Sequence, residues 1–202
     1  MSKKKKQEQQ TALEMPELAV LQEELLRVRY KSRFRRTLMG TIYSLITVAA
    51  IAILIATLWL PVLEITGTSM TPALYEGQIV VSIKNADLSR GDMVAFYYNN
   101  RVLVKRVIAM PGEWVNMDED GNVYINDVLF DEPYLEEHAF GECNIDLPYQ
   151  VPDGRLFVMG DHRSVSVDSR SKTVGCVAEE QIVGKLVMRI WPLDQAGMLQ
   201  RQ

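Results

Sequence analysis

The chain has 202 residues, enough for one domain of ordinary size plus accessory segments, and its 48% hydrophobic content is typical of a globular or singly anchored protein. The formal net charge of −4 hides an asymmetry, since residues 1–36 carry ten Lys or Arg against five Glu while the remainder is acidic. That asymmetry argues for two compartments and against a single polyanionic partner. The two cysteines, Cys143 and Cys176, do not match zinc-ligand spacing, so we expect no metal site.

Residues 1–36 are predicted to form a basic tail with a short amphipathic helix. Residues 1–16, which open MSKKKKQEQQ, are expected to be disordered and to contact anionic lipid through their positive charge. A 3-4-3 spacing of apolar residues follows and predicts a helix whose stripe faces lipid or a partner: Leu18, Leu21, Leu25 and Val28. This stripe is too short for a stable coiled coil.

Residues 37–60 contain no charged side chain. As a helix they would extend roughly 35 Å, enough to cross a hydrocarbon core of about 30 Å. We interpret the segment as a permanent transmembrane anchor, because the apolar core of a cleavable leader is shorter; a removed leader is the alternative. Cations crowd its N-terminal side, at Lys31, Arg33, Arg35 and Arg36. The positive-inside rule therefore predicts a single-pass protein of the cytoplasmic membrane, with its N-terminus in the cytoplasm and the rest outside.

Beyond the anchor the sequence changes to short β-rich runs separated by turn signals: GQIVVSI, DMVAFYY, RVLVKRVIAM, NVYINDVLF, RLFVMG and QIVGKLVMRIW. Asn99-Asn100 and Asp120-Gly121 predict hairpin-type turns between such runs. No long amphipathic helix is visible among them. We therefore expect an all-β outer domain over residues 62–194 and a polar C-terminal tail over residues 195–202.

The first candidate for chemistry is Ser69 in GTSMTPAL, residues 67–74. A serine hydroxyl is a weak nucleophile until a base removes its proton, so the segment alone is better interpreted as a turn after the anchor. Its setting nevertheless favours catalysis. Gly67 permits unusual backbone angles and Pro72 stiffens the exit, so a tight bend could aim backbone N–H groups at an oxyanion.

The second candidate is Lys105 in RVLVKRVIAMPGE. Alternate residues of a strand share a face, so Lys105 lies with Leu103 and Val107. If that face is the core face, burial lowers the lysine pKa and yields a neutral amine that can act as a general base. The alternative is an edge-strand lysine whose amine extends into water.

The third candidate is GDHRSVSVDSR, residues 160–170, which follows the apolar run LFVM. A solvated loop is the simpler interpretation. Alternatively, paired Asp and Arg side chains rigidify the loop against a strand and hold a serine hydroxyl where it orients a base.

Four segments, in this order and behind an N-terminal anchor, resemble the sequence boxes of bacterial type I signal peptidases. They are GTSMTPAL (67–74), RGDMVAF (90–96), VKRVIAMPGE (104–113) and MGDHRSVSVDSR (159–170), and the resemblance covers the chain from about Ile65 to Pro192. In that family the first box carries the nucleophile, matched by Ser69, and the third carries the general-base lysine, matched by Lys105. Each box alone is a weak signal for this family, but four boxes in the same order are highly specific for it.

The resemblance implies a mainly β fold, in which one N-terminal transmembrane helix precedes an antiparallel, β-barrel-like peptidase domain. It also implies a serine endopeptidase that removes signal peptides from exported preproteins by a Ser69/Lys105 dyad and cleaves after small residues of the Ala-X-Ala type, without metal or organic cofactor. The expected partners are signal peptides of secretory preproteins and the lipid bilayer, with the export machinery as a further candidate. We expect no nucleic acid partner and a monomer.

By position the resemblance also assigns supporting roles. Ser166 matches the family serine that hydrogen-bonds the lysine amine. A charged set is expected to brace the site: Arg106, Asp161, Arg163, Asp168 and Arg170, with Arg106 and Asp161 as an ion pair. A second set matches positions that line shallow pockets for small side chains: Ile65, Thr66, Met70, Leu74, Leu103 and Val104.

Two positions depart from the family pattern. His162 stands where asparagine is usual, and Gly67 stands where some members have a serine whose hydroxyl helps bind the oxyanion. The glycine resembles the Gram-positive type and makes the Ser69 backbone N–H the expected main oxyanion donor.

Three other interpretations remain. They are a triad of Ser69 with His162 or His138, an anchored β-domain that binds exported chains without cutting them, and an autocleaving repressor. The anchor and the lack of a recognisable DNA-binding helix pair disfavour the repressor. In the outside compartment Cys143 and Cys176 are compatible either with a disulfide or with two separate thiols.

Overall fold

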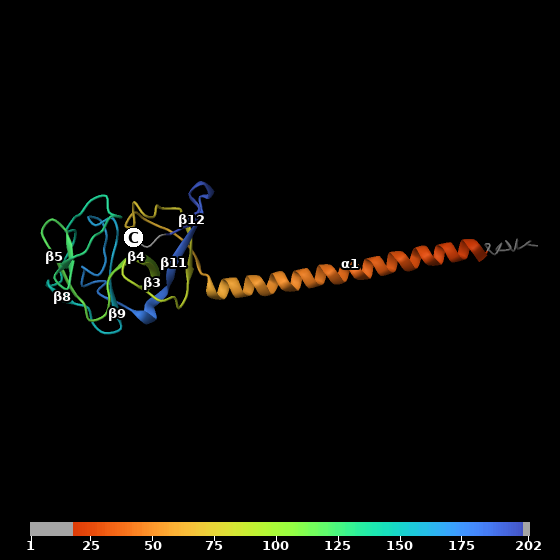
Figure 1. Cartoon of the computed structure of the whole chain (residues 1–202), viewed down its shortest axis with the longest axis horizontal. Helices are drawn as coiled ribbons and strands as arrows, with labels where there is room; N and C mark the ends of the chain where they lie inside the picture. Colours follow the sequence, from red (N-terminus) through yellow and green to blue (C-terminus); the bar gives the residue numbers. More distant parts are fainter. Residues whose placement is uncertain (1–17, 200–202) are drawn as a thin grey trace, which may run out of the picture. The chain divides into compact units, whose positions relative to one another are not determined.

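The computed structural model describes residues 18–199 (Figure 1). The expected disordered tail over residues 1–16 and the end of the expected C-terminal tail therefore lie outside the described residues. The chain divides into two compact units, with the division between Ile53 and Leu54.

The described part of the N-terminal unit belongs to one helix, α1 (Leu18–Trp59), which has no buried residue. Residues 18–36 and 37–59 are thus one continuous helix, where the sequence predicts an amphipathic helix before the anchor. The only breaker-type residue inside it is Gly40, and the helix ends just before Pro61, whose ring disfavours helical geometry at the preceding residue. An 18-residue window in α1 has a mean hydropathy of 2.3, so α1 is long and apolar enough to cross a membrane.

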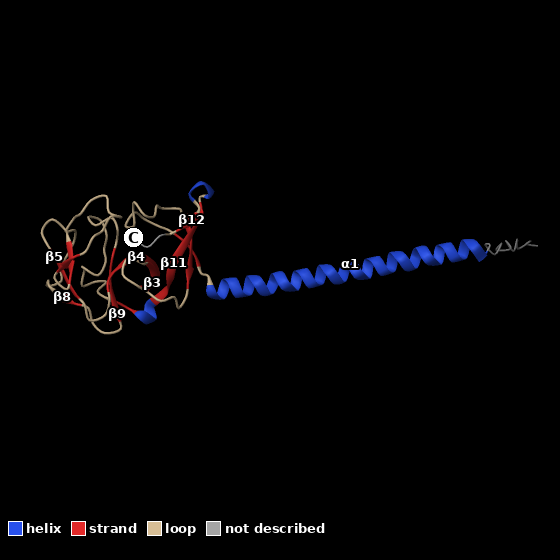
Figure 2. Ribbon diagram, in the orientation of Figure 1, coloured by secondary structure: helices blue, strands red, loops and turns tan. Residues whose placement is uncertain are grey.

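The second unit contains strands and two short 3₁₀ helices, drawn red and blue in Figure 2. The elements are β1 (Val62–Glu64), β2 (Ile79–Ile83), β3 (Met93–Tyr98), β4 (Arg101–Ala109), β5 (Trp114–Met117), β6 (Val123–Ile125), β7 (Val128–Leu129), β8 (Tyr149–Gln150), β9 (Arg155–Met159), β10 (Val177–Ala178), η1 (Glu179–Gln181), β11 (Ile182–Trp191), η2 (Leu193–Gln195) and β12 (Gly197–Met198).

The strands form two antiparallel sheets. The larger has the order β1-β2-β11-β3-β4-β9-β10, with β12 paired to β11, and the smaller has the order β7-β6-β5-β8. The expected fold class, a mainly β antiparallel domain after one long apolar helix, is confirmed. Both sheets are open paths among the described residues. In the segment 195–202, for which the sequence predicts a polar tail, Gly197 pairs with Arg189 of β11.

Two hairpins have the turn chemistry that the sequence predicts. Tyr98 pairs with Arg101 across Asn99 and Asn100, which have φ angles of 44° and 61°, as a two-residue turn of the primed type requires. Gly121, with φ 86°, closes the turn between β5 and β6 through a 3.0 Å bond from its N–H to Asp118 O. The first hairpin aligns β4 against β3, and β9 flanks β4 on its other side.

Three clusters of buried apolar side chains form the core. One lies on the smaller sheet and the ends of β4 and β9, a second joins the segment 65–74 to β2, β3 and β11, and a third joins β3, β4, β9 and β10. Cys143 and Cys176 both belong to the first cluster, and both thiols are free. The chemistry predicted from the sequence lies where the second and third clusters meet, on β4.

Candidate active site

Ser69 lies in a compact turn between β1 and β2. Gly67 adopts a φ of 78°, a left-handed angle that glycine tolerates without strain. The Thr71 N–H donates to Thr68 O at 3.2 Å, and the Leu74 N–H donates to Met70 O at 2.8 Å. Met70 and Leu74 are buried in the second apolar cluster. These anchors hold the turn against the sheet, while the Ser69 side chain stays partly exposed.

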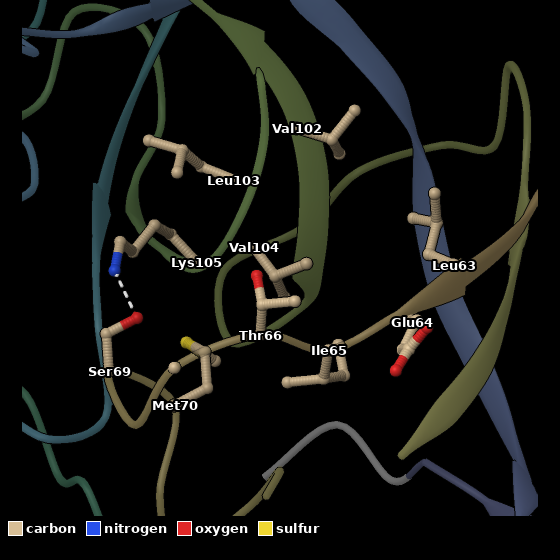
Figure 3. A pocket seen from close by; sticks show the side chains of 11 residues that line it. Leu63, Glu64, Ile65, Thr66, Ser69, Met70, Val102, Leu103, Val104 and Lys105 are labelled. Atoms are coloured by element: carbon tan, nitrogen blue, oxygen red, sulfur yellow. Dashed lines mark hydrogen bonds between the residues drawn. The ribbon is translucent and has the colours of Figure 1, made fainter. Parts of the chain in front are cut away.

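Lys105 approaches Ser69 from β4, as Figure 3 shows. Its Nζ donates to Ser69 Oγ at 2.6 Å. Lys105 pairs with Val94 of β3 and is only 3% exposed, although Val102, nearer the start of the same strand, is exposed. Burial therefore lowers the pKa of Lys105 to about 8; the Arg170 charge adds to this effect, and the carboxylates of Asp168 and Asp161 oppose it.

The predicted contact of Ser166 with the lysine amine is not among the hydrogen bonds formed. Ser166 is buried, and its Oγ forms no hydrogen bond with Lys105 within the described residues. Its hydroxyl instead packs against Gly160: a Cβ at position 160 would collide with Ser166 Oγ and lie 2.5 Å from Ser69 O. Gly160 therefore permits the close approach of the Ser166 segment to the turn that carries Ser69.

The predicted charged set forms two buried ion pairs next to the dyad. Arg106 donates to both oxygens of Asp161, at 2.8 and 2.6 Å, so the two residues expected to pair form a buried ion pair. Arg170 donates to both oxygens of Asp168, at 2.9 and 2.8 Å. Burial opposes ionisation of Asp168, but the bonds and charge of Arg170 outweigh it, so the Asp168 pKa lies below its ordinary value. Asp168 also accepts the Gly160 N–H at 3.0 Å, which fixes that loop.

Arg163 has a partner that the sequence reasoning missed. Its guanidinium forms a bidentate pair with Glu132, and both side chains are fully buried. Glu132 also accepts the Tyr134 hydroxyl at 2.6 Å, and the Arg106 guanidinium lies 3.9 Å from the centre of the Tyr134 ring. The segment FDEPYLEE gives no periodic signal for such burial.

A small pocket of about 80 Å³ adjoins the dyad. Five of the six predicted substrate-binding residues line it: Ile65, Thr66, Met70, Leu103 and Val104. Leu74, the sixth, is fully buried in the second apolar cluster and does not line the pocket. Leu63, Glu64 and Val102 complete the wall, together with Ser69 and Lys105 (Figure 3). Gly67 also lines the pocket.

Neither histidine ring forms a hydrogen bond with Ser69 in the described part of the chain. His162 Nδ1 lies 3.0 Å from Thr71 Oγ1, and its backbone N–H donates to Ser69 O at 3.1 Å. His138 is exposed. Within residues 18–199, no group of three or more His, Cys, Asp or Glu side chains is arranged to hold a metal ion.

The arrangement can carry out acyl transfer: a hydroxyl, a buried amine bonded to it and an adjoining cleft lie together. The family model described as signal peptidase, peptidase S26, matches residues 38–191. Signal peptidase IB of Staphylococcus aureus (strain COL) is 38% identical over 151 residues, covering 65% of this chain and 78% of that protein. Signal peptidase I U of Bacillus subtilis is 32% identical over 166 residues, covering 76% and 88%.

Among solved structures, a signal peptidase I from Enterococcus faecalis V583 matches with a TM-score of 0.44 and 31% identity, covering 50% of this chain and 97% of that one. The family model spans far more than half of the chain and includes all four sequence boxes. The chain therefore belongs to the peptidase S26 family of signal peptidases.

Proposed function

We propose that Ser69 and Lys105 are the nucleophile and the general base with which this enzyme removes signal peptides. The observation that carries the proposal is the 2.6 Å bond between Lys105 Nζ and Ser69 Oγ, made by a buried lysine whose pKa is about 8. A neutral amine at that distance can take the serine proton directly, since proton transfer needs hydrogen-bond contact between donor and acceptor. The membership of the S26 family supplies the substrate class.

The proposed reaction has two halves. Ser69 Oγ attacks the scissile carbonyl carbon while its proton passes to Lys105 Nζ, and the oxyanion accepts the Ser69 N–H. The lysine cation then protonates the departing amine, which leaves an ester between the signal peptide and Ser69. Lys105 next takes a proton from water, the hydroxide attacks the ester, and the cation returns its proton to Ser69. Ser69 N–H makes no hydrogen bond within the described part of the chain, which supports its use as the donor.

The proposed specificity is for small side chains before the cleaved bond. The pocket beside Ser69 has a volume of only about 80 Å³, and the apolar side chains of Ile65, Met70 and Val104 form its wall. An alanine-sized group would fit such a space, and a larger side chain would require the wall to move. Ala-X-Ala signals suit this pocket.

We also propose the topology. The cation-rich part of α1 before residue 37 is cytoplasmic and the peptidase unit lies outside, as the distribution of Lys and Arg favours. A Cys143→Ser background allows a test in spheroplasts. An impermeant maleimide should label an added cysteine at Lys84→Cys and spare one at Ser32→Cys; the reverse pattern would exclude this orientation. Monomeric behaviour and contact with the export machinery remain proposals, to be checked by sizing and crosslinking.

The decisive experiment incubates the full chain in detergent with a preprotein and sequences the new N-terminus. Wild type should cut after an Ala-X-Ala signal, and Ser69→Ala and Lys105→Met should each lose activity by about 10³-fold or more. Full activity in Lys105→Met would exclude the dyad. If no signal peptide is cut by the wild type, a binding protein that does not cleave becomes the better interpretation. The geometry does not support a catalytic triad with His162, because the hydrogen-bond partner of that ring is Thr71.

A further inference from the structure

We propose that His162 is a positioning residue, which orients the Ser69 backbone N–H through Thr71. The inference rests on the Ser69 chemistry proposed above and assigns a role to a side chain that the dyad does not use. His162 comes from the loop after β9, and Thr71 comes from the nucleophile turn. The 3.0 Å contact between His162 Nδ1 and Thr71 Oγ1 joins these two segments, which lie 91 positions apart in the sequence.

The direction of each hydrogen bond follows from its donors. The Thr71 hydroxyl lies 2.9 Å from Thr68 O, and because a carbonyl oxygen only accepts, the hydroxyl proton is committed to that bond. Thr71 Oγ1 must therefore accept from His162, so Nδ1 carries a proton. The chain of donors runs from the imidazole through the hydroxyl to the Thr68 carbonyl. In the neutral ring this leaves Nε2 unprotonated.

The Thr68 carbonyl is the far end of the peptide group that carries the Ser69 N–H. This peptide bond is not among the cis bonds of the described chain, so its C=O and N–H point in opposite directions. Holding Thr68 O from behind therefore aims the Ser69 N–H to the front, where the oxyanion forms. Ser69 O, the next carbonyl, is held by the backbone N–H of His162 at 3.1 Å. One residue thus restrains the peptide groups on both sides of the nucleophile.

The same geometry explains how histidine can stand at position 162, where asparagine is usual in the family. Histidine Nδ1 and the asparagine amide nitrogen are each bonded to Cγ, so both present an N–H at the same distance from the backbone. Alanine retains the backbone N–H to Ser69 O but has no side-chain donor. His162→Asn should therefore restore what His162→Ala loses.

Nuclear magnetic resonance tests the hydrogen-bond direction without reference to activity. The chain has two histidines, so selective ¹⁵N labelling of histidine rings in the full chain in micelles gives two ring systems, and His162→Asn assigns them. At alkaline pH the His162 ring should be protonated at Nδ1, the minor tautomer of a free imidazole side chain. A ring protonated at Nε2 would overturn the proposal.

Steady-state kinetics test whether the His162 side chain contributes to catalysis. His162→Ala should lower kcat by about 10- to 100-fold, because a misaligned oxyanion donor loses part of its effect, and should leave KM nearly unchanged. The pH dependence of kcat/KM should keep its midpoint, since the charges around Lys105 are untouched. His162→Asn should recover most of the lost activity, and His138→Ala, at an exposed ring, should match wild type.

Variants of Thr71 give a second kinetic test of the His162–Thr71 hydrogen bond. Thr71→Val removes the hydroxyl and should be at least as slow as His162→Ala, Thr71→Ser should be near wild type, and the double variant should be no slower than Thr71→Val alone. Thermal unfolding of each variant shows whether it is folded at the assay temperature. Wild-type kcat in His162→Ala, or equal loss in His162→Ala and His162→Asn, would overturn the positioning role. Activity in Ser69→Ala would instead overturn the proposed function.

Discussion

At the scale of single residues, the proposed role of Lys105 as general base makes its pKa set the pH range of the reaction. Only its neutral form can accept the Ser69 proton, and its pKa is about 8. We therefore expect kcat/KM to rise with pH, with a midpoint near 8, and to level off above it. At pH 7 about a tenth of the molecules would hold the neutral amine. A pH–rate profile on the free enzyme measures this directly, and a rate that is flat from pH 6 to 9 would contradict the assignment of Lys105 as base.

The same burial makes Lys105 a cost to stability. Its folded pKa lies below the value of 10.5 for an exposed lysine, so the unfolded chain binds more protons between these values, and stability rises with pH across that window. Lys105→Met should thus raise the free energy of unfolding by about 1–3 kcal/mol at pH 7. Denaturant unfolding at pH 7 and at pH 10 checks this. The stability gained by Lys105→Met should be smaller at pH 10 than at pH 7. An equal gain at both pH values would mean that better packing, and not removal of the buried charge, stabilises the variant.

At the scale of elements, the loop after β9 meets the nucleophile turn across Gly160. A methyl group there would lie 2.5 Å from Ser69 O and collide with Ser166 Oγ. Gly160→Ala should therefore lower kcat by about 10- to 100-fold by displacing Ser69, and destabilise the domain by about 1–3 kcal/mol.

Gly197→Ala in β12 is the matched control for this prediction, because a Cβ there meets nothing within 4 Å. Steady-state kinetics and thermal unfolding of both variants separate the two sites. Equal behaviour of Gly160→Ala and Gly197→Ala would show that the close approach at Gly160 has no role in catalysis.

At the scale of the whole peptidase unit, the buried pair of Glu132 and Arg163 ties the segment after β7 of the smaller sheet to the loop after β9 of the larger. Glu132→Gln would leave Arg163 buried without its counter-charge. We expect a loss of about 3–5 kcal/mol in the free energy of unfolding, against less than about 1 kcal/mol for Arg90→Lys at a partly exposed pair. Denaturant unfolding of both variants measures these losses. Similar losses for Glu132→Gln and Arg90→Lys would argue against a stabilising connection between the two segments.

The predictions from sequence succeeded where a local pattern has one physical solution. The Asn99-Asn100 turn had to be a tight hairpin because asparagine tolerates positive φ, and the run before Pro61 had to be helical because it is long, apolar and uninterrupted. Patterns with several solutions did less well. The stripe at Leu18 was expected in a short amphipathic helix before the anchor, and in the structure this helix continues into the anchor as α1.

The placement of Leu74 shows why the pocket was only partly predictable. A box match assigns residues by position and not by direction, and the turn from Ser69 to Leu74 directs this side chain into the core. Ser166 shows the same limit: position puts it near Lys105, and only packing reveals that its hydroxyl faces Gly160 and forms no hydrogen bond with Lys105 in the described part of the chain. Glu132 could not be found at all, because its partner Arg163 is 31 positions away.

By itself the sequence determined the helix long enough to span a membrane, the β-rich unit after it and the four boxes that identify the family, because periodicity, length and residue spacing are local quantities. Tertiary structure alone decided that Lys105 Nζ reaches Ser69 Oγ and that burial lowers the Lys105 pKa. It also decided that Thr71 is the partner of His162. Contact, desolvation and hydrogen-bond direction are properties of groups brought together from distant segments, and they exist only once the chain has folded.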